Sequence, residues 1–275
     1  MKNDKARPMY PEHALYERYK ETHLDRTSSD TFPDVTKRVT LENMNYAINL
    51  CEAWDFFLDI GGGSGHYAAG LAGMFKRGSV IEIDAHPEQQ DLVRLRPNVS
   101  VVNKFIEECE GTEKADFILL ADIFEHIKDV RSFASHLARL QSKGAIVYIM
   151  TPNPFFCGPV AESGLHHTLH PNGHISHYTR QEISSVMEEA GYELIFNLYE
   201  EGPFRQKAKR VIKGISKRDK KWHTAIAYRI ARPLLLAAAL PLQSLLARLT
   251  YRSEKELRKD EFSTMTQDLA FKKMR

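Results

Sequence analysis

The sequence contains little cysteine and no apolar stretch long enough to cross a membrane. Its 275 residues include only three cysteines, and such an odd number, without CxxC spacing, is typical of a reducing compartment. The longest uncharged apolar run, residues 233–247, contains two prolines, whereas a membrane-spanning helix needs about 20 apolar residues. The N-terminus is charged from its second residue and lacks the apolar core of a signal peptide. We therefore expect a cytoplasmic protein.

The net charge of +2 conceals an uneven distribution along the chain. Residues 1–200 hold 19 Lys and Arg against 29 Asp and Glu, whereas residues 201–275 hold 19 against 7, which gives net charges of −10 and +12. We find no internal repeat and no low-complexity segment. The sequence predicts three regions: an N-terminal helical lead-in or cap (1–50), a main domain (51–202), and a basic, apolar, helical C-terminal appendage (203–275).

Short apolar runs alternate with helical patterns through the main domain. Asp129 can cap a helix with apolar positions spaced along one face, and Thr179 with Glu182 forms a capping box for a later helix that Gly191 can end. The apolar runs are residues 56–60, 80–83, 99–102, 117–121 and 145–150. This alternation predicts an α/β fold, a doubly wound and mainly parallel Rossmann-like sheet with helices on both faces.

Four glycines within five residues follow the first of these strands, in the segment FFLDIGGGSGHYA. Glycines also occur in turns that only reverse the chain. In an open α/β sheet, however, a loop between the first strand and its helix lies where ligands bind. A dinucleotide fingerprint fits poorly, because its sixth position from Gly61 is His66. The pattern acidic-x-G-x-G-x-G is met in full by Asp59, Gly61, Gly63 and Gly65.

This loop resembles motif I of the class I S-adenosylmethionine-dependent methyltransferases. The next strand, VIEIDAHPE, supplies Asp84 nineteen residues after Gly65, where a carboxylate can accept hydrogen bonds from ribose hydroxyls. Residues 115–155, with their EHI, KG and TPNP motifs, and residues 174–194 are similar to segments of the subfamily that includes the ubiquinone-biosynthesis O-methyltransferases. The resemblance covers about residues 50–200 and implies S-adenosylmethionine as cofactor.

The resemblance also implies which residues hold the cofactor, with two departures from the family pattern. The third strand ends in VVNKFIEE, without the family's acid for the adenine amino group, so Asn103 is the candidate polar contact and Phe105 or Ile106 the candidate packing partner. No clear final antiparallel strand follows residues 192–199. The predicted cofactor-binding residues are Asp59, Gly61, Gly63, Gly65, Asp84, Asn103, Phe105 and Ala121, the last at the end of the fourth strand.

Histidines are expected on the acceptor side of the cofactor. His126 follows the fourth strand, and it is either a general base or a structural group that binds a neighbouring carbonyl. A histidine-rich loop follows the fifth strand and contains His166, His167, His170, His174 and His177. These histidines could bind a metal, but residues 166–177 contain no acidic residue and no zinc-motif spacing, so we predict no metal site. The candidate catalytic residues are His126 and His174.

The basic appendage has three interpretations. It could bind nucleic acid, although the acidic main domain disfavours this. It could lie on an anionic membrane surface, which would place the protein at the inner face of the membrane. It could also be a helical region packed on the main domain or on a second subunit. The sequence as a whole predicts O-methylation of a glycan, a lipid-linked acceptor or a quinone precursor, with a noncatalytic S-adenosylmethionine-binding or regulatory module as the alternative.

Overall fold

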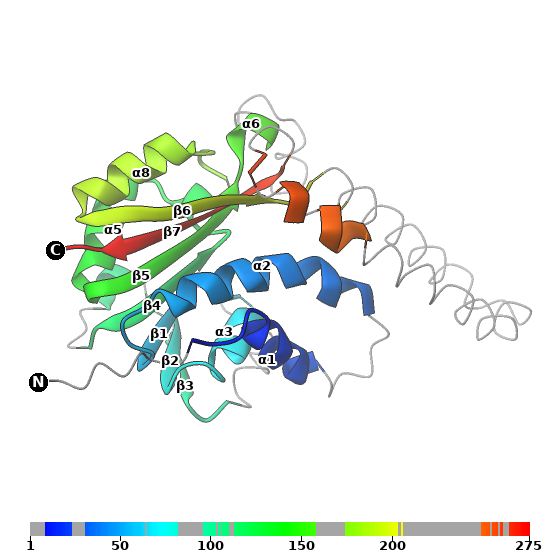
Figure 1. Cartoon of the computed structure of the whole chain (residues 1–275). Coiled ribbons are helices and arrows are strands. Elements are labelled where there is room, and N and C mark those ends of the chain that lie inside the picture. The colour runs from blue at the N-terminus through cyan, green and yellow to red at the C-terminus, as the bar shows by residue number, and fades with distance from the viewer. Residues whose placement is uncertain are drawn as a thin grey trace, which may run out of the picture.

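The fold is a central sheet with helices on both faces, as the computed structural model shows (Figure 1). The structure describes residues 9–23, 31–63, 65–81, 96–102, 104, 106–109, 113–157, 174–202, 205, 249–253, 255–257, 259–260 and 264–275. Within these ranges, none of the helices has the length and apolar character that would be needed to traverse a lipid bilayer.

Seven strands form one sheet in the order β3-β2-β1-β4-β5-β7-β6. Strands β1 to β5 are parallel, and β7 runs antiparallel to both β5 and β6. The strands are β1 (Phe56–Ile60), β2 (Arg77–Ile81), β3 (Val99–Val102), β4 (Ala115–Ala121), β5 (Gln141–Pro152), β6 (Tyr192–Glu200) and β7 (Thr266–Lys273). The predicted doubly wound, mainly parallel sheet is confirmed. Its strand order reverses between β1 and β4, which is where such folds bind ligands.

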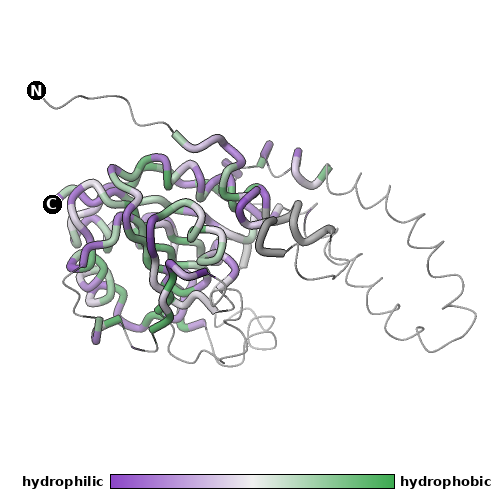
Figure 2. Tube along the Cα trace, turned by 90° about the horizontal axis from the view of Figure 1, so that it is seen from below, coloured by the Kyte–Doolittle hydropathy of each residue, from purple (hydrophilic) through white to green (hydrophobic). Residues whose placement is uncertain are grey.

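Alternating side chains of the central strands point into two separate cores. Phe57 and Phe117 face one core, whereas their neighbours Leu58 and Ile118 face the other. The helices on the first face are α1 (Ala14–His23), α2 (Thr31–Asn49) and α3 (His66–Leu71), and those on the second are α5 (Val130–Arg139) and α8 (Arg180–Glu189). Apolar segments gather within the body of the domain (Figure 2). Both faces of the central strands are therefore buried, which explains their nearly continuous apolar sequences.

Local signals place the two helices of the second face as predicted. The Asp129 carboxylate accepts a hydrogen bond of 3.0 Å from the Ser132 backbone N–H at the start of α5. Thr179 and Glu182 form the complete capping box of α8. Gly191 follows that helix with φ +87°, a backbone conformation that favours glycine. Three short helical turns complete the described elements: η2 (Ile106–Glu108), η3 (Phe124–His126) and α6 (Pro154–Cys157).

The C-terminal boundary of the predicted appendage is wrong. The last residues of the chain form β7, which lies between β5 and β6 inside the sheet. Its buried polar residues Gln267 and Asp268 interrupt the apolar pattern by which the other strands are recognised. Residues 201–265 are therefore an insertion between two neighbouring strands, with 16 Lys and Arg against 6 Asp and Glu. Most of this insertion, including the apolar run, lies outside the described residues.

Candidate active site

The glycine loop joins β1 to α3 at the carboxyl edge of the sheet. Gly61 and Gly63 both adopt positive φ angles, of +70° and +51°. A β-carbon at Gly61 would lie 2.0 Å from Cδ1 of Ile123, whereas one at Gly63 would meet no atom within 4 Å. The first glycine is thus required by close packing against the segment after β4. The second faces open space.

Two further predicted cofactor residues that the structure describes lie on the strands β1 and β4. Asp59 is 1% exposed and lies on β1 directly before the loop, opposite Val80 and Leu119 of the neighbouring strands. Ala121 is half-buried at the end of β4. Among the described residues, no atom lies within 4 Å of a β-carbon at Gly63, so a ligand of the size of the methionine part of S-adenosylmethionine could approach the backbone there. The predicted contacts Asp84, Asn103 and Phe105 lie outside the described residues and stay predictions.

The two candidate catalytic histidines lie next to each other. His126 is exposed and ends the short turn after β4. The His174 ring is 5.0 Å from the His126 ring, measured between centroids, and meets it edge to face. The Nδ1 atom of His174 is 2.8 Å from Nε2 of His177. The structure thus brings together His126, His174 and His177, while His166, His167 and His170 lie outside the described residues.

A buried glutamate that the sequence analysis did not select stands behind these histidines. Glu125 is 1% exposed, and its Oε2 accepts a hydrogen bond of 3.0 Å from the Thr151 hydroxyl. Its other oxygen, Oε1, has no hydrogen-bond partner among the described residues and lies 4.0 Å from Nε2 of His174. Burial, and secondarily the negative charge of Asp122, raises the pKa of Glu125 to about 8. Burial therefore favours the protonated form of the Glu125 carboxyl group.

The same residues offer donor atoms that a cation could use. Glu125, His126 and His174 each place one oxygen or nitrogen within 4.8 Å of the others. Carboxylate oxygen and imidazole nitrogen are ordinary ligands of divalent metals. The sequence of the histidine-rich loop does not reveal this grouping, because the glutamate comes from the turn after β4.

A second polar cluster lies where β6 and β7 meet α2. The Asn43 side-chain amide donates hydrogen bonds to Asp268 (3.0 Å) and to Glu200 (3.4 Å). Arg205, the described residue at the start of the insertion, donates a hydrogen bond of 2.9 Å to Glu200. Burial, and next the neighbouring Glu200 carboxylate, raises the pKa of Asp268. Sequence reasoning could not find this cluster, because it requires residues more than 200 positions apart.

Tyr67 connects this cluster to the glycine loop. It lies in the first turn of α3, and burial, followed by the charges of Asp122 and Glu200, raises the pKa of its hydroxyl. The pKa of Tyr67 therefore depends on two carboxylates, one just after β4 and the other at the end of β6. Asp122, the first residue after β4, also adopts a positive φ of 55°, as residues at functional sites often do.

A Rossmann-like sheet in this strand order, with a glycine loop after β1, defines the class I methyltransferases. A family model described as a methyltransferase domain matches residues 12–196, which is more than half of the chain. The chain belongs to this methyltransferase family, and S-adenosylmethionine is its methyl donor. No curated protein matches the chain.

Solved structures support the fold. A putative sarcosine dimethylglycine methyltransferase from Galdieria sulphuraria is similar with a TM-score of 0.57 and 17% identity, over 88% of this chain and 86% of that one. Coclaurine N-methyltransferase, bound to N-methylheliamine and SAH, is similar with a TM-score of 0.58 and 15% identity, over 90% of this chain and 75% of that one. Geranyl diphosphate C-methyltransferase from Streptomyces coelicolor is similar with a TM-score of 0.54 and 13% identity, over 93% of this chain and 86% of that one. These neighbours methylate different atom types, so the fold alone does not choose the acceptor.

Proposed function

We propose that the enzyme methylates a hydroxyl group of a glycan, a lipid-linked intermediate or a quinone precursor. The observation that carries the proposal is the pair of adjacent histidines, His126 and His174, at the turn after β4. A hydroxyl acceptor loses a proton during methylation, and imidazole is the side chain best suited to accept one near neutral pH. An acceptor that is already an anion or a free amine can attack the methyl carbon without first losing a proton, so a base of this kind would contribute less to its methylation.

The chain's own residues have two tasks in this reaction. When bound, S-adenosylmethionine supplies a methyl group on a positively charged sulfur, which leaves as a neutral sulfide. The glycine loop and Asp59 would hold the donor in line with the acceptor oxygen, since alignment is the main requirement of an in-line displacement. As that oxygen forms its bond to the methyl carbon, a nitrogen of His126 takes up the hydroxyl proton.

The surroundings of the two histidines favour His126 as the residue that contacts the acceptor. His126 is exposed, whereas the His174 side chain is only 7% exposed. The ring nitrogens of His174 face His177 on one side and Glu125 on the other. His174 therefore serves better as the neighbour that orients His126, and its own role as base is the second choice within the same proposal.

The test begins with cell extracts and a labelled methyl donor, and mass spectrometry identifies the labelled product. With that acceptor, His126→Ala should lower turnover by about 100-fold or more while affinity for S-adenosylhomocysteine stays the same. The matched control is His136→Ala, because His136 is an exposed histidine on α5 whose ring contacts only its own helix among the hydrogen bonds described. Normal turnover in both His126→Ala and His174→Ala, or a product methylated on nitrogen or carbon, would reject the hydroxyl mechanism.

We further propose that the insertion holds the enzyme at an anionic membrane surface. Its support is the net charge of +10 over residues 201–265, together with the apolar run at residues 233–247. Basic clusters beside leucine-rich segments are attracted to anionic lipid headgroups. The insertion leaves the sheet after β6, at the same carboxyl edge as the glycine loop. A membrane-bound acceptor would therefore approach the cofactor from the side on which the insertion begins.

A further inference from the structure

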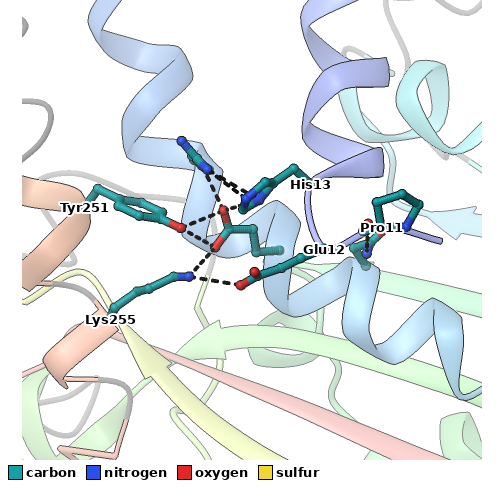
Figure 3. Close-up of polar contacts among 8 residues, drawn as sticks. Pro11, Glu12, His13, Tyr251 and Lys255 are labelled. Carbon is teal, nitrogen blue, oxygen red and sulfur yellow. Dashed lines mark hydrogen bonds and ion pairs between the residues drawn. The ribbon is translucent and has the colours of Figure 1, made fainter. Parts of the chain in front are cut away.

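A single buried carboxylate on α2 gathers three separate segments of the chain. Glu42 is 3% exposed, and the NεH of Arg38 donates to its Oε1 at 2.8 Å. The Tyr251 hydroxyl lies 2.8 and 2.9 Å from its two oxygens, and Nζ of Lys255 lies 3.4 Å from Oε2. Tyr251 and Lys255 belong to the returning end of the insertion, and both reach toward α2 (Figure 3). We call this set of contacts the Glu42 hub.

The hub also fastens the segment that leads into α1. Nδ1 of His13 lies 2.8 Å from the same Glu42 carboxylate, and Lys255 donates a hydrogen bond of 2.9 Å to Glu12 (Figure 3). The guanidinium of Arg38 stacks on the Tyr251 ring at 4.4 Å from its centroid. The insertion therefore contacts α1's leading segment both directly, through Lys255, and indirectly, through the shared carboxylate.

Helix α1 in turn packs on the helix that follows the glycine loop. A β-carbon at Gly70 of α3 would lie 3.4 Å from Leu15 and 3.7 Å from the Tyr19 backbone, so the two helices touch with almost no space between them. The Tyr19 ring lies 6.3 Å from that of His66, the first residue of α3. A displacement of α1 would consequently reach the start of α3, where the cofactor loop ends.

The other end of the insertion is linked to the same part of α2 through Glu200, the last residue of β6. Arg205 holds Glu200, which also accepts hydrogen bonds from Thr40 and Asn43. Both ends of the insertion thus converge on residues 38–43, less than two turns of one helix. Thr40 and Asn43 are linked to the first end through Glu200, and Arg38 and Glu42 contact the second directly.

We propose that Glu42 is a positioning residue for the cofactor site, which makes the packing of α1 on α3 depend on the docked insertion. Released from Tyr251 and Lys255, Glu42 would keep its contacts with Arg38 and His13, so the hub can open at one side without leaving a buried charge unpaired. This inference rests on the proposed role of the glycine loop in cofactor binding. It assigns to the insertion an effect on cofactor affinity, in addition to any attachment to a surface.

The experiment compares full-length variants by calorimetry with S-adenosylhomocysteine and by hydrogen exchange. The double variant Tyr251→Phe/Lys255→Met should bind about 5- to 50-fold more weakly, a coupling of the usual size between linked sites. Amide exchange should accelerate in α1 and at the start of α3 but stay unchanged in β4. Arg252→Ala is the matched control, because the exposed Arg252 side chain pairs with Glu256 and not with the hub. The single variant Lys255→Arg keeps Tyr251 and the positive charge at position 255, so it should bind S-adenosylhomocysteine as tightly as the wild type.

Four outcomes are distinguishable. Selective loss of affinity and of α1 protection, with wild-type affinity in Lys255→Arg, supports the proposal. Affinity and exchange equal to those of Arg252→Ala overturn it while leaving the methyltransferase site intact. Absence of binding in the wild-type chain would overturn the role of the glycine loop itself. A uniform increase of exchange that includes β4 would indicate general destabilisation and also reject a positioning role.

Discussion

At the scale of single residues, glycine is needed at Gly61 and at Gly63 of the loop for two different reasons. Gly61 lacks room for any side chain because Ile123 occupies the place of its β-carbon. Gly63 has room, but that room is where the cofactor is expected. A substitution at Gly61 would therefore disturb the packing of the loop, whereas one at Gly63 would act mainly on the ligand.

Gly63→Val is expected to abolish binding of S-adenosylhomocysteine while the protein still unfolds cooperatively. The valine side chain would fill the open space beside the loop, and its backbone would have to hold φ near +51°, which costs about 1–2 kcal/mol. Gly191→Ala controls for that strain, since Gly191 has φ +87° far from the loop. Calorimetry and thermal melting measure both effects. Unchanged affinity in Gly63→Val would remove this loop from the cofactor site.

Glu125 gives the fold a specific dependence on pH. Its pKa of about 8 exceeds the ordinary value of 4.5, so the folded protein binds this proton more tightly than the unfolded chain does. The contribution to stability is complete below about pH 4.5 and is lost as the pH rises to about 8, with a slope of up to about 1.4 kcal/mol per pH unit. In Glu125→Gln this slope should disappear.

Urea unfolding across that pH range, in buffer with a metal chelator, measures the effect. Glu188→Gln is a suitable control because Glu188 is an exposed carboxylate on α8. Identical pH slopes in wild type and Glu125→Gln would show that Glu125 is ionised in the folded protein.

At the scale of elements, sequence predicts what depends on neighbouring residues. The strand at residues 56–60, the α5 cap at Asp129 and the α8 capping box are set by short-range patterns, and each lies where the sequence places it. The glycine loop is predictable for the same reason. Its position between β1 and α3 follows from local propensity and from the steric freedom of glycine.

The elements that sequence misses depend on distant partners. Asp268 is buried in β7 only because Asn43 and Glu200, from α2 and β6, supply its polar contacts. Without those partners the segment has the composition of a polar tail. Glu42 is similar, since its burial needs Tyr251, a residue 209 positions later in the sequence. No local pattern announces either cluster.

Removal of β7 is expected to unfold the sheet, whereas removal of the insertion is not. A chain ending at Glu201 loses Leu269 and Phe271, which are fully buried, and leaves β5 and β6 without the strand that joins them. A chain in which a flexible Gly/Ser linker replaces residues 206–248 keeps β7. Near-ultraviolet circular dichroism and thermal melting should show a cooperative fold only in the second protein. Cooperative melting of the chain ending at Glu201 would contradict the central position of β7.

At the scale of the whole molecule, the insertion and the rest of the chain differ in net charge, which is +10 over residues 201–265 and −10 over residues 1–200. The intact protein should sediment with anionic vesicles and not with neutral ones. The bound fraction should fall as salt rises, because the Debye length shrinks from about 10 Å at 0.1 M to about 3 Å at 1 M. The protein lacking residues 206–248 should stay in the supernatant. Equal sedimentation of the two would reject the membrane role, and a change from dimer to monomer on deletion would favour a subunit contact instead.

The late position of β7 also governs how the protein is made. A ribosome finishes β6 at Glu200 and must then synthesise the 65 residues of the insertion before β7 begins at Thr266. At about 5–20 residues per second this takes roughly 3–13 s. During that interval β5 has an exposed edge and β6 has no place in the sheet. The nascent chain is thus vulnerable to aggregation between the synthesis of β6 and that of β7, and any factor that protects it during synthesis must act in that interval.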